Sequence, residues 1–165
     1  MNNPVAESAL VAAPADTVVQ LKRTLAEGRA ELRAGFIQNP SPAQLLRSHT
    51  TLVDRVLKSV WTEVSMPARL TLLAVGGYGR GQLFPYSDVD VLLLLPEDLE
   101  ESDKEKVSEL VGNLWDIGLE IGHSARSVAQ CVTEATQDIT VETNLLEARF
   151  DRLMSYGKYK EVALK

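Results

Sequence analysis

The chain has 165 residues, of which 45% are hydrophobic and 24% charged, and its formal net charge at pH 7 is −6. This size and composition suit one globular domain with a buried core, and the lack of a basic run argues against nucleic acid as the partner. A single cysteine, Cys131, excludes an internal disulfide, and no stretch approaches the length of a membrane span. We therefore expect a cytoplasmic protein that binds neither nucleic acid nor a membrane.

The N-terminal third is predicted to be a tail followed by two helices. Residues 1–15 are rich in Ala and contain two prolines, which is typical of a flexible tail. A first helix is predicted over residues 17–34. A second should follow Ser41, with that residue in a capping box and Pro42 in the first helical position. His49 lies in the apolar series of this second helix and is interpreted as a core residue, since no second ligand has suitable spacing.

Two short apolar runs in the middle of the chain are predicted to be adjacent buried strands. The first, residues 70–75, ends on Gly76 and Gly77, and the second begins with Asp88 and Asp90. These two carboxylates are two positions apart, so a strand places them on the same face. Carboxylates are depleted in strands, and a buried one has to be paired or hold a metal. Oxygen ligands suit Mg²⁺, which we therefore expect Asp88 and Asp90 to bind.

The glycines between the two strands predict an anion site beside these carboxylates. Gly76 and Gly77 allow a tight turn and the close approach of a ligand to bare N–H groups. A short helical turn starting near Tyr78 would direct its free N–H groups to the same place. A phosphate cradle beside metal-binding carboxylates is typical of phosphoryl or nucleotidyl transfer. The competing interpretation, a strand that merely ends in solvent with its two aspartates, leaves the position of the glycines unexplained.

The second half of the chain is predicted to alternate helix and strand. Residues 97–106 are acidic and should form a solvated turn and helix start, followed by an amphipathic helix that Gly118 stops. Trp115 lies on the apolar stripe of that helix and is expected in the core. A third strand is predicted over residues 119–124, and a last helix over residues 139–150. Between them, a short helix capped by Ser127 and Gln130 should bury the Cys131 thiol. The sequence of elements predicts an α/β fold with a mixed sheet flanked by helices.

Three blocks of sequence carry a family resemblance. The first block resembles the signature of the polymerase-β-type nucleotidyltransferase superfamily: an apolar residue and Gly-Gly, then ten residues, then Asp-apolar-Asp-apolar. The longer string GGYGRGQLFPYSDVDVLLL, followed by WDIGLEIGHSARSV and DITVETNLLEAR, resembles the N-terminal domain of the bifunctional uridylyltransferase/uridylyl-removing enzymes. The resemblance covers residues 45–149. It implies a polymerase-β-like core over residues 16–150.

The resemblance also sets an expectation for the ends of the chain. The family's enzymes continue into an HD-type phosphohydrolase domain and two amino-acid-sensing ACT domains. Residues 151–165, rich in Lys and Tyr, depart from that pattern. The chain therefore resembles an isolated or truncated transferase core with a divergent C-terminal tail.

By resemblance, the reaction is Mg²⁺-dependent transfer of UMP from UTP to a tyrosine of the nitrogen-regulatory PII protein, with two metal ions. The implied nucleotide-binding residues are Gly76, Gly77, Arg80 and Ser87. Arg80 would contact the phosphates, although an exposed loop Arg paired with a nearby carboxylate explains it equally well. Ser87 would cap or orient the strand that carries Asp88. The loop aromatics Tyr78, Phe84 and Tyr86 are interpreted as pinning the loop rather than stacking a uracil.

The superfamily usually adds a third carboxylate from a neighbouring strand, and Glu120 is predicted to supply it. It is an acid between two apolar residues in an apparent strand. The rivals are Asp116, at the surface of a helix end, and Asp138, which suits a helix N-cap. An interpretation without a catalytic role pairs Glu120 with Arg126 or solvent.

Two alternatives to uridylyl transfer to PII stay open. Another protein nucleotidyltransferase, such as the adenylyltransferase of glutamine synthetase, would use the same metal pair with a different acceptor or base. An inactive core would retain affinity for nucleotide or PII without turnover.

Overall fold

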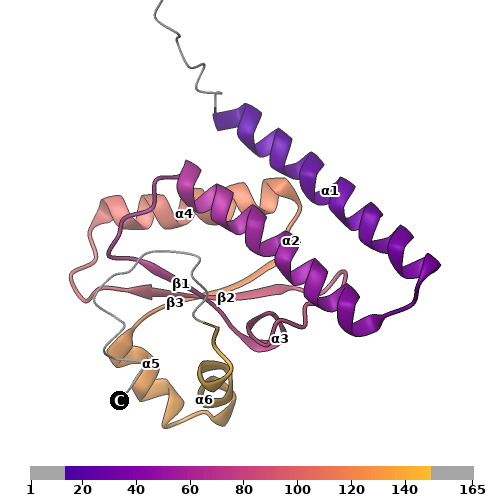
Figure 1. Ribbon diagram of the computed structural model, residues 1–165. Coiled ribbons are helices and arrows are strands. Elements are labelled where there is room, and N and C mark those ends of the chain that lie inside the picture. The colour runs from indigo at the N-terminus through magenta and orange to yellow at the C-terminus, as the bar shows by residue number, and fades with distance from the viewer. Residues whose placement is uncertain (1–13, 150–165) are drawn as a thin grey trace, which may run out of the picture.

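The computed structural model describes residues 14–149, which form a three-stranded sheet and six helices (Figure 1). In chain order the elements are α1 (Pro14–Gln38), α2 (Pro42–Glu63), β1 (Thr71–Ala74), α3 (Gly76–Gly79), β2 (Val89–Leu95), α4 (Glu101–Ile117), β3 (Ile121–Ser127), α5 (Val128–Ala135) and α6 (Ile139–Leu146). Helices α1, α2 and α4 lie on one side of the sheet and α5 and α6 on the other. The predicted α/β architecture is confirmed. None of the helices in this part of the chain is long and apolar enough to cross a membrane.

The sheet is mixed, as predicted, and its order is β1-β2-β3. Strands β1 and β2 are antiparallel, with Leu73 opposite Leu92. Strands β2 and β3 are parallel, with Asp90 opposite Gly122. Because β2 is the central strand, its first residues lie between the turn that follows β1 and the start of β3. That position is where the sequence predicted the site.

Alternation along the strands divides the core into two layers. Val89, Val91 and Leu93 of β2 pack toward α2 and α4, whereas Leu92 and Leu94 pack toward Cys131 of α5. Because neighbouring residues of a strand face opposite ways, Asp90 lies on the α5 and α6 side of the sheet. The two layers therefore fix the face from which the site opens.

The first helices follow the prediction with corrections at their starts. Helix α1 begins at Pro14, so Pro14 and Ala15, assigned to the tail, are helical, since proline is tolerated in a first helical turn. The rest of the predicted tail lies outside the described residues, as does the segment 151–165. Helix α2 begins at Pro42 after an extended Ser41, as predicted. The expected capping box is wrong, because the Ser41 side chain makes no capping hydrogen bond.

Two expectations for α4 are wrong. Trp115 is 58% exposed, because the buried stripe runs through Leu110, Leu114 and Ile117 and leaves Trp115 beside it. The acidic segment is not wholly solvated either: Asp103 is buried at the start of α4. Its carboxylate accepts hydrogen bonds from Arg69, at 2.6 Å from Nη2 and 3.2 Å from Nε. An ion pair thus replaces the predicted hydration.

Candidate active site

The Asp90 carboxylate lies against two glycines, Gly76 and Gly122, at positions where a larger residue would collide with it. A Cβ atom on Gly122 of β3 would lie 2.5 Å from Asp90 Oδ1, and one on Gly76 would lie 3.1 Å from Oδ2. Gly76 also has a φ of +59°, which disfavours any side chain there. The Asp90 carboxylate is therefore held between the turn after β1 and the start of β3, beside Gly76 as the sequence predicted.

The negative charge of Asp88 affects the ionisation of Asp90. Both are exposed, and Asp88 precedes the first residue of β2. Partial burial raises the pKa of the Asp90 carboxyl above its ordinary value, and the negative charge of Asp88 raises it further. A cation bound to both carboxylates would relieve this repulsion. Carboxylate oxygens are the ligand type that a divalent metal such as Mg²⁺ takes, so these two aspartates are the residues that would hold one.

The turn after β1 forms the short helix α3, which begins at Gly76, two residues earlier than predicted. Its first backbone bonds run from Gly79 N to Val75 O, at 2.8 Å, and from Arg80 N to Gly76 O, at 3.1 Å. The N–H groups of Gly76 and Gly77 consequently have no acceptor within the helix. These are the two groups that the sequence assigned to phosphate.

Arg80 and Ser87 lie in the segment between β1 and β2, and both make contacts within the protein. Arg80 is ion-paired with Glu147, just after α6, which matches the alternative interpretation of an exposed arginine bound to a carboxylate. Ser87 donates from its Oγ to the Phe84 carbonyl oxygen at 2.9 Å and stabilises the turn that precedes Asp88. This contact agrees with a role in orienting the strand. Nucleotide contacts by either residue stay predictions.

Glu120 lies immediately before β3 rather than inside it. Helix α4 ends at Ile117 and is capped by Gly118, whose φ is +95°. Leu119 N still bonds to the Leu114 carbonyl at 3.1 Å, and the strand begins only at Ile121. Leu119 and Ile121 pack in the layer of α2 and α4, as predicted, so alternation directs Glu120 to the face of Asp90. Glu120 also lines an open pocket of about 480 Å³ together with Asp88 and Trp115.

The third carboxylate is nevertheless not assembled. Among residues 14–149, no group of three or more His, Cys, Asp or Glu side chains is arranged to hold a metal ion. Asp138 caps α6 by accepting from Thr140 N at 2.7 Å, as expected, and that bond lowers the pKa of its carboxyl. Asp116 is exposed on α4. The role of Glu120 therefore stays a prediction.

Two titratable side chains outside the site are buried as expected. His49 accepts from Arg29 Nε at 3.4 Å and donates from Nδ1 to the Leu83 carbonyl at 3.2 Å. Burial lowers the pKa of His49, so the neutral ring is favoured. Burial likewise raises the pKa of the Cys131 thiol. Both side chains belong to the core.

Two of the three loop aromatics differ from the prediction. Phe84 and Tyr86 are 62% and 84% exposed, so they do not pin the loop. Tyr86 has a φ of +68°, and this turn conformation points its ring into solvent instead of the core. Tyr78 does pin the loop, since its side chain is only 1% exposed. Its hydroxyl donates to Asp54 Oδ1 at 2.5 Å.

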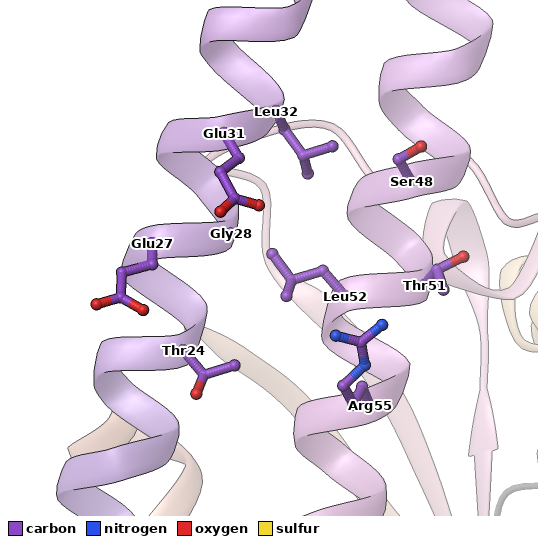
Figure 2. A pocket seen from close by; sticks show the side chains of 9 residues that line it. All are labelled: Thr24, Glu27, Gly28, Glu31, Leu32, Ser48, Thr51, Leu52 and Arg55. Carbon is purple, nitrogen blue, oxygen red and sulfur yellow. The ribbon is translucent and has the colours of Figure 1, made fainter.

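A second pocket, of about 460 Å³, lies between α1 and α2, away from the aspartates. Figure 2 shows Leu32 and Leu52 directed into the space between the helices, while Glu27 points away from α2. The two helices approach closely because α1 has Gly28 here, where a Cβ would lie 2.8 Å from the Leu52 methyl groups. This pocket contains no pair of facing carboxylates and belongs to helix packing.

Sequence reasoning missed several residues that shape the site. Gly122 could have been found, because an isolated glycine in a strand often marks a close approach. Asp54 and Arg149 are joined by hydrogen bonds of 2.8 and 2.9 Å although they are 95 positions apart. No local sequence pattern predicts a contact between residues so far apart in the chain.

A mixed sheet with two aspartates at the start of its central strand, beside a glycine turn, is consistent with a nucleotidyltransferase domain. The sequence model of the nucleotidyltransferase domain matches residues 53–162, and the chain belongs to this family, which has the polymerase-β-like fold. Three similar proteins are each named bifunctional uridylyltransferase/uridylyl-removing enzyme. That of Aromatoleum aromaticum is 47% identical over 84% of this chain, that of Nitrosospira multiformis 52% over 78%, and that of Thiobacillus denitrificans 50% over 78%. The matched regions cover only 15% to 17% of these relatives.

Proposed function

We propose that this domain transfers UMP from UTP to a tyrosine of the nitrogen-regulatory PII protein. The observation that carries the proposal is the Asp90 carboxylate held beside Asp88 and the Gly76 turn, in a chain 47% to 52% identical to proteins named uridylyltransferases. A cytoplasmic setting, where nucleoside triphosphates and Mg²⁺ are available, is part of the proposal. The acceptor is inferred from the family resemblance.

The reaction forms one bond and breaks one. The tyrosine oxygen attacks the α-phosphorus of UTP, the bond from that phosphorus to the β-phosphate breaks, and pyrophosphate leaves as the hydroxyl proton is released. A tyrosine hydroxyl has an ordinary pKa of about 10 and is a weak nucleophile at neutral pH. Mg²⁺ ions bound at the site would make the hydroxyl more acidic and offset the charge of the triphosphate.

The chain's own residues would hold and orient the reactants. Asp88 and Asp90 would bind the metal, and their mutual repulsion would be relieved by it. The free N–H groups of Gly76 and Gly77 would donate to the β- and γ-phosphates. The two N–H groups are fixed by the backbone of α3, so they need little reorganisation when the nucleotide binds.

Arg80 would bind the triphosphate by leaving its ion pair with Glu147. Its ion pair with Glu147 is partly exposed, with 47% and 29% of the two side chains accessible, and pairs of this kind contribute roughly 0–1 kcal/mol. A triphosphate offers more negative charge than one carboxylate. Transfer of Arg80 from Glu147 to the phosphates would therefore need little energy.

Incubation with labelled UTP or ATP, Mg²⁺ and PII tests the proposal. We expect UMP transfer to PII, and Asp88→Asn should abolish it without unfolding the domain. Asp98→Asn is a matched control, because it removes the same charge from an exposed position beyond the opposite end of β2. Transfer of AMP in place of UMP, or UMP transfer by Asp88→Asn at the wild-type rate, would contradict the proposal. Binding of UTP without any transfer would indicate an inactive binding domain.

A further inference from the structure

A partly buried polar network lies behind the glycine turn, where Tyr78 packs in the core layer of Val89 and Val91, on the face of the sheet opposite to Asp90. Its centre is Asp54 of α2, whose side chain is only 13% exposed. The carboxylate accepts three hydrogen bonds: one from the Tyr78 hydroxyl at 2.5 Å and two from Arg149, at 2.8 Å to Oδ1 and 2.9 Å to Oδ2. Each partner comes from a different part of the chain.

The network contacts the turn through Tyr78. Tyr78 is the third of the four residues of α3, and its side chain is buried. Burial, and next the charge of Asp54, raise the pKa of the Tyr78 hydroxyl well above its ordinary value, so it remains a donor. The Arg149 guanidinium also lies over the Tyr78 ring, at 5.3 Å from its centre.

The segment after α6 holds the same turn through its backbone. Arg149 N donates to the Ala74 carbonyl at the end of β1, at 2.9 Å. A Cβ on Gly79 would lie 2.6 Å from the Glu147 carbonyl oxygen, so this segment approaches the turn as closely as a glycine permits. The turn is therefore enclosed between α2 and the residues that follow α6.

We propose that Asp54, Tyr78 and Arg149 are positioning residues that fix the Gly76–Gly79 turn for the triphosphate. The inference rests on the proposed function, because it assigns the network a task in nucleotide binding. None of the three side chains would touch the nucleotide. They act by preventing movement of the N–H groups of Gly76 and Gly77, and a displacement of about 1 Å in such groups can lower a rate by about 100-fold.

A second ion pair in the chain, away from the turn, serves as a comparison for the network. Arg69 forms a second bidentate pair with the buried Asp103, just before the start of β1, and also contacts Glu100. Each carboxylate contacts its arginine through both oxygens, so a variant that weakens either pair should lower stability. Only loss of the Asp54 network should change the turn.

The test compares Tyr78→Phe, Arg149→Lys and Asp103→Asn with the wild-type chain by hydrogen exchange and by calorimetric titration with Mg²⁺ and UTP. Tyr78→Phe removes one hydroxyl and Arg149→Lys keeps the charge but loses the paired contact. We expect the Gly79 and Arg80 amides to exchange about tenfold faster in both, and the Kd for UTP to rise about tenfold. In the transfer assay the KM for UTP should rise while the KM for PII stays unchanged.

Asp103→Asn should lower the Tm without either effect. The proposal is overturned if Tyr78→Phe leaves exchange in the turn at the wild-type rate, or if Asp103→Asn accelerates it equally. If the wild-type chain binds no UTP, the proposed function fails. In that case the exchange comparison still decides whether the network holds the turn.

Discussion

The cradle around Asp90 makes Gly122→Ala an informative substitution, because it alters the site without changing any proposed ligand. The new methyl group would lie 2.5 Å from Asp90 Oδ1, where ordinary contacts begin near 3.4 Å. Gly122 is an ordinary strand residue paired with Asp90, and its φ lies outside the left-handed region. Alanine therefore strains no backbone angle, and the carboxylate has to move instead.

The size of the effect follows from that displacement. The carboxylate has to retreat by about 1 Å, and a misplacement of this size in a reacting group can reduce the rate by about 100-fold. Stability should not fall in parallel, since replacing a glycine in a strand removes an entropic cost of about 0.5–1 kcal/mol. We expect loss of metal-dependent transfer in a domain whose Tm is unchanged or slightly higher.

Three measurements separate these effects. Mn²⁺ binding followed by electron paramagnetic resonance reports on the aspartates directly, labelled-UTP transfer reports on the reaction, and thermal unfolding reports on the fold. Gly112→Ala in α4 is the matched control, because a Cβ there has no neighbour within 4 Å. It should keep both metal binding and transfer.

Wild-type Mn²⁺ affinity and transfer in Gly122→Ala would refute the reasoning, since the Asp90 carboxylate would then have no fixed place. A large fall in Tm would refute it differently, by showing that the methyl group displaces the strand instead of the carboxylate.

Three further predictions follow from charge and packing. Because the pKa of Asp90 is raised, the metal-free domain should lose stability as the pH rises from about 4 through that raised pKa; Asp88→Asn should weaken this loss in urea unfolding. Because the pKa of His49 is lowered, stability should be lost as the pH falls below about 6.5, and His49→Leu should remove that dependence even if it lowers stability at pH 7. Gly28→Ala crowds a leucine of α2 at 2.8 Å, whereas Gly35→Ala meets nothing within 4 Å; Gly35→Ala should raise the Tm and Gly28→Ala should give a Tm at least about 4 °C below it.

The sequence predicted most of the architecture because the hydrophobic periods were clear. The two apolar runs gave β1 and β2, and period two placed Asp90 on the face away from Val89 and Val91. The start and stop signals of the helices were also predicted: Pro42 begins α2, and Gly118 caps the end of α4 in a left-handed conformation. These features depend on neighbours in the chain, so local patterns contain them.

The errors concern contacts between distant segments. Trp115 fits an apolar spacing, yet the direction of α4 against the sheet leaves it exposed, beside His123 at 6.4 Å between ring centres. Asp103 belongs to an acidic run, yet Arg69 makes its burial favourable. In each case packing against a distant segment decides the environment, and periodicity contains no information about that packing.

The bond between Asp54 and Arg149 has a consequence for the order of events during synthesis. Asp54 leaves the ribosome long before Arg149, because 95 positions separate them, and their contact closes a loop that takes in all three strands. Loop closure of this length is an entropic barrier that folding overcomes late. An emerging chain can thus pair β1 with β2 and complete α2 while its glycine turn still lacks its final support. The ability to bind nucleotide would then arise late in folding, once residue 149 can pack against the turn.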